Sequence, residues 1–184
     1  MTWLNLERGD PVVHGGGSAA VGFSETFEEF YAREFPAVVG LAFALSGSRM
    51  ASEDLAQEAF LAAHRDWERV AGYERPDLWV RRVVSNMSMS MFRRRYAEAR
   101  ALARFTLGAA TTLPQLSDDD AEFWGAVRSL PRRQAQVIAL RYLEDRSVAE
   151  IAEILGTATG TVKKQLHDGR QNVARRLRLE EDDT

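Results

Sequence analysis

Apolar residues recur at helical spacing over most of the chain, and the pattern is clearest between Leu130 and Arg178. A helix is expected directly after Pro131, because proline favours the first helical position. Ser147 and Glu150 have the spacing of a capping box, in which each side chain binds a free backbone donor at a helix start. Gly156 is suited to end the short helix that follows, because glycine adopts a left-handed conformation without strain.

A longer basic helix is expected after a tight turn. Its apolar positions share one face: Val162, Leu166, Gly169, Val173 and Leu177. Six Lys or Arg residues and a single Asp lie between Lys163 and Arg178. A short helix, a glycine turn and a longer basic helix is the layout of a helix-turn-helix, whose second helix enters the major groove of DNA. An ordinary helical hairpin with a solvated basic face is the alternative that periodicity alone leaves open.

The first half of the chain also predicts amphipathic helices. One begins near Phe23 with Ser24 as its cap, and Pro36 is expected to kink or divide it. The next begins near Ser52 and runs towards Trp67. Its outward strip contains Asp54, Gln57, Glu58 and Leu61. From spacing alone, a solvated acidic face is the favoured interpretation of this strip, because polar residues at this spacing are ordinary on helices.

A loop from Ala71 to Pro76 precedes a further helix expected from Asp77 to about Arg95. Its exposed side is expected to carry Arg81, Arg82 and Asn86, and it ends in Arg93, Arg94 and Arg95. Cations at a helix C-terminus stabilise the helix dipole, but three in a row also suit contact with DNA phosphates. Tyr73, in the loop, is a candidate to stack on an unpaired base.

Composition narrows the class of protein. No segment has the alternating pattern of a strand, so an all-α protein with two small helical domains joined by a flexible linker is expected. The 184 residues include no cysteine, which excludes disulfides and thiolate metal sites. No apolar run is long enough to span a membrane.

The expected divisions of the chain are a leader (1–22), a first domain (23–96), a linker (97–120), a second domain (121–178) and an acidic tail (179–184).

The net charge of −3 is unusual for a protein that binds nucleic acid, but the charges are segregated. Basic residues concentrate between Arg81 and Arg104 and between Lys163 and Arg178. Acidic residues concentrate at Asp118–Asp120 and in the tail. We therefore expect weak binding to free DNA, with a partner protein that supplies most of the affinity.

Two of these segments resemble the bacterial extracytoplasmic-function (group IV) sigma factors of the sigma-70 family. The segment Asp54–Phe60 is similar to the family's D-L-x-Q-E-x-F helix. The segment from Leu130 to Lys163 is similar to the family's L-P-x-x-x-R motif and G-T-V-K recognition helix. The second motif alone also occurs in other DNA-binding domains, but the two in this order are specific. The resemblance extends from about Phe23 to Arg178.

This resemblance implies a σ2 domain over residues 23–96 that holds core polymerase and opens the −10 element. It implies a σ4 domain over residues 121–178 that reads the −35 element. The implied partners are promoter DNA, an anti-sigma factor, and the β′ clamp helices and β flap of RNA polymerase. The implied protein is cytoplasmic, associates with the nucleoid when bound to polymerase, and has no catalytic activity, cofactor, metal or membrane insertion.

The resemblance also assigns residues to three surfaces. Those implied to bind core polymerase are Asp54, Gln57, Glu58, Phe60 and Leu61. Those implied to bind the −10 element are Tyr73, Arg81, Arg82, Asn86, Arg93, Arg94 and Arg95. Those implied to bind the −35 element are Thr161, Lys163, Lys164, His167 and Arg170.

Three departures from the family pattern affect the recognition helix. Ala158 stands where the family often has a serine cap, and Gly169 interrupts the helix at a cost of about 1 kcal/mol. Asp168 either accepts a hydrogen bond from cytosine or repels phosphate. The alternative function is a stand-alone helix-turn-helix regulator that binds DNA without polymerase. An enzyme has little support, because His14, His64 and His167 are scattered.

Overall fold

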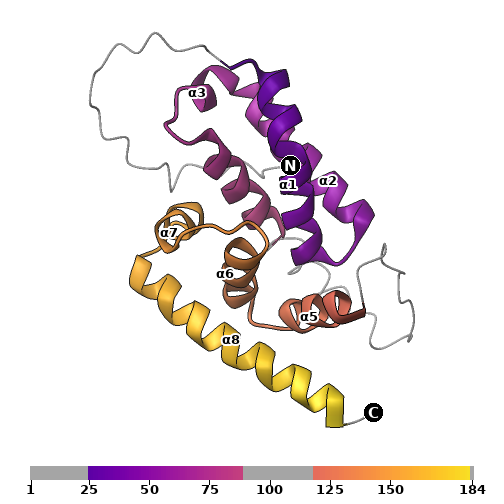
Figure 1. Cartoon of the computed structure of the whole chain (residues 1–184). Coiled ribbons are helices and arrows are strands. Elements are labelled where there is room, and N and C mark those ends of the chain that lie inside the picture. Colours follow the sequence, from indigo (N-terminus) through magenta and orange to yellow (C-terminus); the bar gives the residue numbers. More distant parts are fainter. Residues whose placement is uncertain (1–24, 89–117, 183–184) are drawn as a thin grey trace, which may run out of the picture.

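The computed structural model describes residues 25–88 and 118–182, and every regular element in these ranges is an α-helix (Figure 1). The helices are α1 (Phe27–Ser46), α2 (Arg49–Arg65), α3 (Trp67–Ala71), a helix over residues 76–88, α5 (Asp118–Arg128), α6 (Arg132–Tyr142), α7 (Val148–Leu155) and α8 (Thr159–Asp182). The all-α prediction is confirmed. The predicted leader, the Arg93–Arg95 triplet and most of the predicted linker lie outside the described residues.

The first helix begins later than the sequence pattern suggested. Thr26 caps α1 in a capping box with Glu29, whereas the predicted cap, Ser24, lies outside the described residues. Pro36 does not divide the helix, which continues to Ser46. We attribute this continuity to burial of the turns on both sides of Pro36, because packed apolar side chains offset the lost backbone hydrogen bond. Gly47 then ends α1 with a φ of 68°.

The second helix begins four residues earlier than a start capped by Ser52 would give. Ser48 caps α2 by accepting a hydrogen bond from the backbone N–H of Ala51. Ser52, the predicted cap, is buried inside the helix and donates to the carbonyl of Arg49 at 2.7 Å. Both serines fit the composition rule for a cap, so the sequence could not distinguish them.

An aromatic cluster forms the core of the N-terminal half. Phe30 from α1 and Phe60 from α2 are buried, with ring centroids 5.7 Å apart. Tyr31, Phe35 and Trp67 pack around them at centroid distances from 4.6 to 5.7 Å. These edge-on and stacked contacts hold α1, α2 and α3 together and thereby fix the outward face of α2.

The C-terminal half follows the predicted helix-turn-helix closely. The capping box of Ser147 and Glu150 starts α7, and Gly156 ends it with a φ of 59°. Pro131 directly precedes α6 and is not its first residue. Gly169 of α8 is buried against α6, and a Cβ atom there would lie 3.1 Å from Cγ1 of Ile138. Close packing of α6 and α8 therefore explains a glycine that would otherwise only weaken the helix.

The two halves pack directly against each other, a contact that the sequence pattern did not predict. In Figure 1, α6 and α7 lie beneath the N-terminal helices, and α8 runs along the outer side of α6. The C-terminal half of α1 contacts both α5 and α6. Whether a residue at this junction is buried therefore depends on contacts with the other half of the chain.

Candidate nucleic-acid interface

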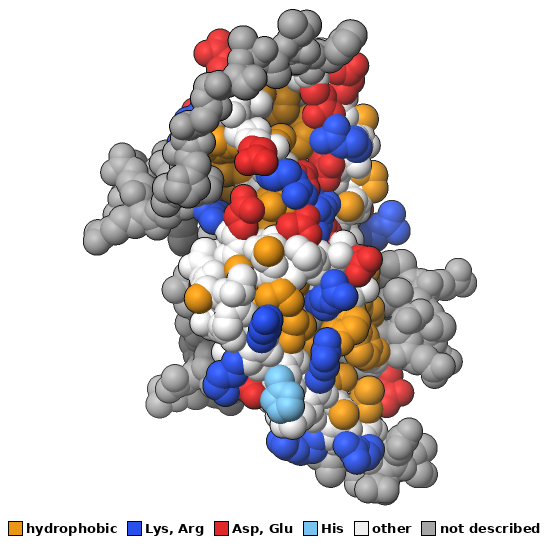
Figure 2. Space-filling view, turned by 60° about the vertical axis from the view of Figure 1, so that its left-hand side comes forward, with side chains coloured by type: hydrophobic (Ala, Val, Ile, Leu, Met, Phe, Trp, Pro, Cys, Tyr) orange, Lys and Arg blue, Asp and Glu red, His pale blue; other side chains and the backbone are white. Residues whose placement is uncertain are grey.

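The exposed face of α8 is the first candidate for DNA contact. Val162, Leu166, Gly169 and Val173 are buried, which leaves the opposite face to solvent. All five residues predicted for the −35 element are exposed: Thr161, Lys163, Lys164, His167 and Arg170. Figure 2 shows Lys, Arg and His side chains gathered over the lower part of the molecule, where α8 lies. A basic helix presented in this way matches the geometry of a recognition helix.

Side-chain contacts divide these α8 residues into two groups. Lys164 Nζ lies 2.8 Å from Oδ2 of Asp168. Arg170 donates to the hydroxyl of Tyr142 and lies over its ring, with 5.6 Å from Cζ to the centroid. Lys163 has no hydrogen bond or ion pair within the part of the chain that the structure describes. Near the start of α8, Lys163 is therefore the lysine whose charge is not paired with another described residue.

The outward strip of α2 is the second candidate surface. Asp54, Gln57 and Glu58 are exposed, and Leu61 is 54% exposed, as expected for a protein-binding surface. Phe60 is only 1% exposed, so its prediction as a surface contact is wrong. It belongs to the aromatic core. The apolar residues Ala56 and Ala63, four positions before and three after Phe60 on the same helix face, could have revealed this.

The helix over residues 76–88 differs most from expectation. Arg81 was predicted on the exposed side, but its side chain is only 2% exposed. Arg82 is half-buried, Asn86 is exposed, and Tyr73 is half-buried in the preceding loop. The prediction that Arg81 faces solvent is wrong because Glu144, in the segment between α6 and α7, covers it. Arg82 is partly covered by the C-terminal end of α7.

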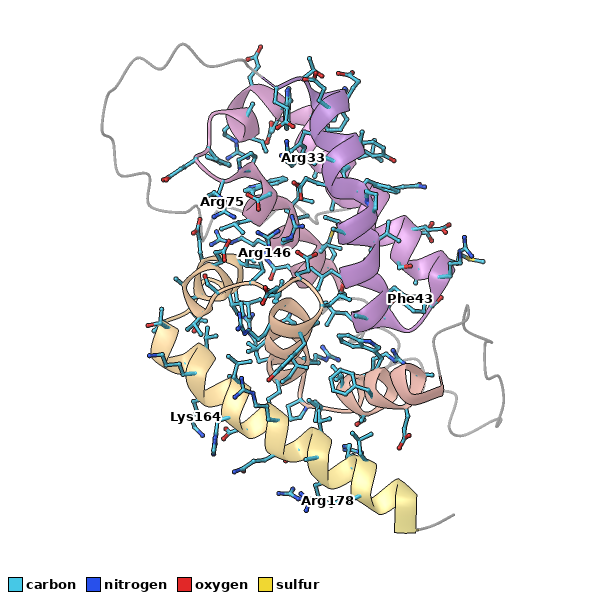
Figure 3. The ribbon with its side chains drawn as sticks, viewed as in Figure 1. Arg33, Phe43, Arg75, Arg146, Lys164 and Arg178 are labelled. Atoms are coloured by element: carbon cyan, nitrogen blue, oxygen red, sulfur yellow. The ribbon has the colours of Figure 1, made fainter. Side chains whose placement is uncertain are left out.

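A cluster of charged side chains joins the two halves at this place, and we call it the seam. Its members are Glu34, Arg75, Asp77 and Arg81 from the N-terminal half, and Glu144, Arg146 and Glu150 from the C-terminal half. Figure 3 shows Arg75 and Arg146 at the junction between the N-terminal helices and α7.

Arg81 occupies the centre of the seam. Its Nη1 lies 2.8 Å from Oε2 of Glu34, and its Nε contacts Oε2 of Glu144. Glu144 is itself only 4% exposed and also pairs with Nε of Arg146 at 3.3 Å. Nη1 of Arg146 then lies 3.0 Å from Oδ2 of Asp77. Charges from both halves thus alternate through the interface.

The outer part of the seam involves the capping residue of α7. Nη2 of Arg75 lies 2.8 Å from Oε1 of Glu150, and Nε of Arg75 lies 3.0 Å from Oδ1 of Asp77. The other carboxylate oxygen of Glu150 accepts from the backbone N–H of Ser147 at 2.9 Å. Glu150 therefore starts a helix in one half and pairs with an arginine in the other.

These contacts favour the charged forms of Glu150, Asp77 and Arg81. The hydrogen bond from Arg75, followed by those of Ser147, lowers the pKa of Glu150 to about 2. Burial acts to raise the pKa of Asp77, but hydrogen bonding and charge from Arg75 outweigh it and hold this pKa low. Burial also acts to lower the pKa of Arg81, yet the charge of Glu144 raises it overall. Glu150, Asp77 and Arg81 are therefore charged near neutral pH.

Polar contacts to the backbone complete the junction. Arg82 donates from Nε to the carbonyl of Ile154 at 3.2 Å and from Nη2 to the carbonyl of Glu153. The amide of Gln136 donates to the carbonyl of Ser85 at 2.8 Å, and this bond is buried. The first contact places a guanidinium at the C-terminal end of α7, where the helix dipole is negative.

Sequence reasoning missed the ion pairs that join the two halves across the seam. Glu144, Arg146 and Glu150 lie 63 or more positions from the residues of the N-terminal half that they contact. A charged loop residue gives no sign of so distant a partner. The capping role of Glu150 was predicted, but its ion pair was not.

No group of three or more His, Cys, Asp or Glu side chains within residues 25–88 and 118–182 could hold a metal ion. Over the same ranges, every helix is too short or too polar to cross a lipid bilayer.

Comparisons with known proteins match both halves. Residues 30–98 match the family model described as Sigma-70 region 2, and residues 120–173 match that described as Sigma-70, region 4. The chain is 27% identical over 152 residues to the ECF RNA polymerase sigma factor SigW of Bacillus subtilis, which covers 75% of this chain and 81% of SigW. It is 28% identical over 141 residues to the RNA polymerase sigma-E factor of Streptomyces avermitilis, which covers 77% of this chain and 79% of that protein.

A solved structure has a similar fold over most of the chain. It is the sigma factor RpoE in complex with the anti-sigma factor NepR from Bartonella quintana, with a TM-score of 0.70 and 23% identity. The match covers 83% of this chain and 96% of that one.

Proposed function

Because this chain belongs to the extracytoplasmic-function sigma factors of the sigma-70 family, we propose that it is a group IV member that directs core RNA polymerase to promoters. The observation that supports this most directly is the pairing of two surfaces in one chain. The α2 strip is exposed in the region 2 match, and the basic face of α8 is exposed in the region 4 match.

The α2 strip is proposed to bind the β′ clamp helices of the polymerase through Asp54, Gln57, Glu58 and Leu61. A row of polar side chains beside an exposed leucine suits a protein partner, because the leucine supplies apolar area and the polar groups fix orientation. Region 4 is proposed to contact the β flap. Phe60 lies in the core beneath the α2 strip and supports that strip.

The exposed face of α8 is proposed to read the −35 element. Lys163, Lys164 and His167 are exposed and are proposed to reach base edges or nearby phosphates. Thr161 lies near the helix start, where backbone N–H groups attract phosphate. Arg170 is held by Tyr142 and is proposed to contact phosphate from that position. Asp168 is proposed to limit the charge of Lys164.

The helix over residues 76–88 and the loop before it are proposed to hold the opened −10 element. Asn86 is already exposed for this role, Tyr73 is half-buried, and Arg81 and Arg82 are covered by the C-terminal half. The residues Arg93, Arg94 and Arg95, outside the described part, are proposed as phosphate contacts. Trapping an unstacked base offsets an unstacking cost of a few kcal/mol, which favours melting.

The proposed work of the chain is binding, without catalysis of its own and without a cofactor. The proposed place of action is the cytoplasm, on the nucleoid when bound to polymerase. RpoE of Bartonella quintana forms a complex with the anti-sigma factor NepR, and by analogy we propose an anti-sigma factor for this chain. The boundaries 1–22, 23–96, 97–120, 121–178 and 179–184 remain the proposed division of the sequence.

The deciding experiment is transcription from a promoter library by purified core polymerase, with and without the full chain. The expected result is a set of start sites that depends on the chain and shares two short upstream elements. A stand-alone regulator, the alternative function, predicts binding to duplex DNA in a gel shift without polymerase. Such binding, together with no chain-dependent transcription, would overturn the proposal.

A further inference from the structure

We propose that Gln171 is a positioning residue for His167, and that it commits the imidazole to donate a hydrogen bond to a purine base of the −35 element. This role rests on the proposed function, because it concerns the element that α8 is proposed to read. It adds the class of base that His167 recognises and a second residue on which that recognition depends.

Gln171 lies on the outer side of α8. It is exposed, and it comes nine positions after the buried Val162. Nine residues make about two and a half turns of an α-helix, so these two side chains lie on opposite faces. Gln171 is also about two turns from Lys164 and from Arg178, which both point away from α6 and α7 in Figure 3. Gln171 therefore shares the face that is proposed to contact DNA.

A side-chain hydrogen bond joins Gln171 to His167, one turn earlier in the helix. Nε2 of Gln171 lies 3.0 Å from Nε2 of His167. Helical side chains lean towards the N-terminus, so Gln171 reaches back to His167 while His167 extends towards the start of α8. Residues in the first turns of a recognition helix contact base edges. Gln171 therefore supports the imidazole from the side away from those turns.

The chemistry of this bond decides which nitrogen of the imidazole carries the proton. The amide nitrogen of glutamine has two N–H donors and no acceptor. Nε2 of His167 must therefore accept from Gln171, and in the neutral ring the proton is then on Nδ1. No contact of Nδ1 occurs within residues 25–88 and 118–182, so this N–H group is free to donate to DNA.

A hydrogen-bond donor at this place selects among the base edges of the major groove. Guanine and adenine both present N7 as an acceptor, and guanine adds O6. Thymine has a single acceptor, O4, beside a bulky methyl group, and cytosine presents an amino group, which is itself a donor. We therefore expect His167 to favour a purine and to discriminate most strongly against cytosine.

Without Gln171 this selection is lost. A neutral imidazole has one donor nitrogen and one acceptor nitrogen, and either nitrogen can hold the proton. When no amide occupies Nε2, the ring can turn an acceptor nitrogen towards the DNA and accept from the amino group of cytosine. Gln171 therefore controls which bases His167 accepts, more than how tightly the helix binds.

The base preference of the holoenzyme tests this role. Core polymerase with the full chain selects promoters from a library that is randomised over the −35 element. Gln171→Met removes the amide and keeps the length of the side chain, and His167→Ala identifies the base position that the imidazole reads. The matched control is Gln165→Met, the same chemical change at a half-buried position on another side of α8. Circular dichroism checks that each variant folds.

We expect the wild type to prefer a purine to cytosine about tenfold at the position that His167→Ala identifies. Gln171→Met is expected to reduce this ratio to about twofold at that position alone, and Gln165→Met to leave it unchanged. The double variant His167→Ala with Gln171→Met should match His167→Ala, because Gln171 acts through His167. An unchanged ratio in Gln171→Met, an additional loss in the double variant, or no position that responds to His167→Ala would overturn the inference.

Nuclear magnetic resonance of the free full chain tests the hydrogen bond without polymerase. The chemical shifts of the ring nitrogens distinguish the two tautomers at about pH 9, where a histidine ring is neutral. His167→Ala identifies the signal of His167 among those of the three histidines. We expect a proton on Nδ1 in the wild type and a mixture of tautomers in Gln171→Met. A proton on Nε2 in the wild type would overturn the inference, whereas a holoenzyme that selects no promoters at all counts against the proposed function.

Discussion

Arg81 and Glu144 are 63 positions apart in the sequence, yet Nε of Arg81 contacts Oε2 of Glu144 across the junction of the two halves. Their side chains are only 2% and 4% exposed. A guanidinium this deeply buried needs its partners, because an uncompensated buried charge is strongly destabilising. This pair therefore joins the helix over residues 76–88 to the segment between α6 and α7.

Removing the charge of Arg81 is expected to destabilise the protein. Arg81→Met leaves Glu34 and Glu144 buried without their common partner, at a cost of up to about 3–5 kcal/mol in the free energy of unfolding. Urea denaturation measures this loss. The matched control is Arg49→Met, which breaks an exposed pair with Glu53 and is expected to cost less than about 1 kcal/mol. Similar losses in both variants would contradict the central role of Arg81.

The ionised Glu150 is expected to make stability depend on acidity. Its pKa is lowered from 4.5 to about 2 in the folded protein, so its contribution is complete above pH 4.5 and is lost as the pH falls towards 2. One such proton gives a slope of up to about 1.4 kcal/mol per pH unit. Denaturation curves of wild type and Glu150→Gln should therefore converge as the pH falls through this window. A difference in stability between wild type and Glu150→Gln that stays constant with pH would show that ionisation of Glu150 does not cause the pH dependence.

Gly169 is expected to tolerate even a methyl group poorly. In Gly169→Ala, the new Cβ would lie 3.1 Å from Cγ1 of Ile138, and overpacking costs about 1–3 kcal/mol. The gain in helix propensity offsets at most about 1 kcal/mol of this. Gly160→Ala in the same helix meets nothing within 4 Å and is expected to be neutral or stabilising. Thermal denaturation compares the two, and a more stable Gly169→Ala would contradict the packing explanation.

Local signals predicted the C-terminal half better than the N-terminal half. The capping box of Ser147 and the αL glycine at 156 depend only on neighbouring residues, and both are present. The start of α2 was wrong because Ser48 and Ser52 satisfy the same local rule. Neighbouring residues were therefore enough to locate both ends of α7. They were not enough to locate the start of α2.

In the candidate sites, too, features that depend on nearby residues could be predicted and features that depend on distant contacts could not. Exposure of the α8 residues follows from a single helical period, so the sequence could predict it. Phe60 was assigned to the surface from a motif, although its helical neighbours place it in the core. The burial of Arg81 could not be predicted, because it depends on Glu144 in the other half of the chain. Contacts between distant segments leave no local pattern.

Lys163 and Asp168 are expected to affect DNA binding in opposite directions. Lys163→Ala removes an exposed, unpaired charge and should weaken promoter binding by the holoenzyme about tenfold, corresponding to about 1.4 kcal/mol. Asp168→Asn frees Lys164 from its 2.8 Å ion pair and should strengthen binding at the same salt concentration. Anisotropy titrations of promoter DNA with holoenzyme measure both. Weaker binding by Asp168→Asn would indicate instead that Asp168 reads a base directly.

The α2 strip is expected to control polymerase binding independently of DNA contact. Gln57→Ala with Glu58→Ala removes two exposed polar groups without disturbing the core, so the fold should survive while capture of core polymerase in a pull-down is lost. The matched control is Lys163→Ala, which should retain polymerase binding and weaken promoter use. The two surfaces lie on different helices of different halves, so their effects should separate. If both variants lost polymerase and promoter activity to the same extent, the division of roles between α2 and α8 would be wrong.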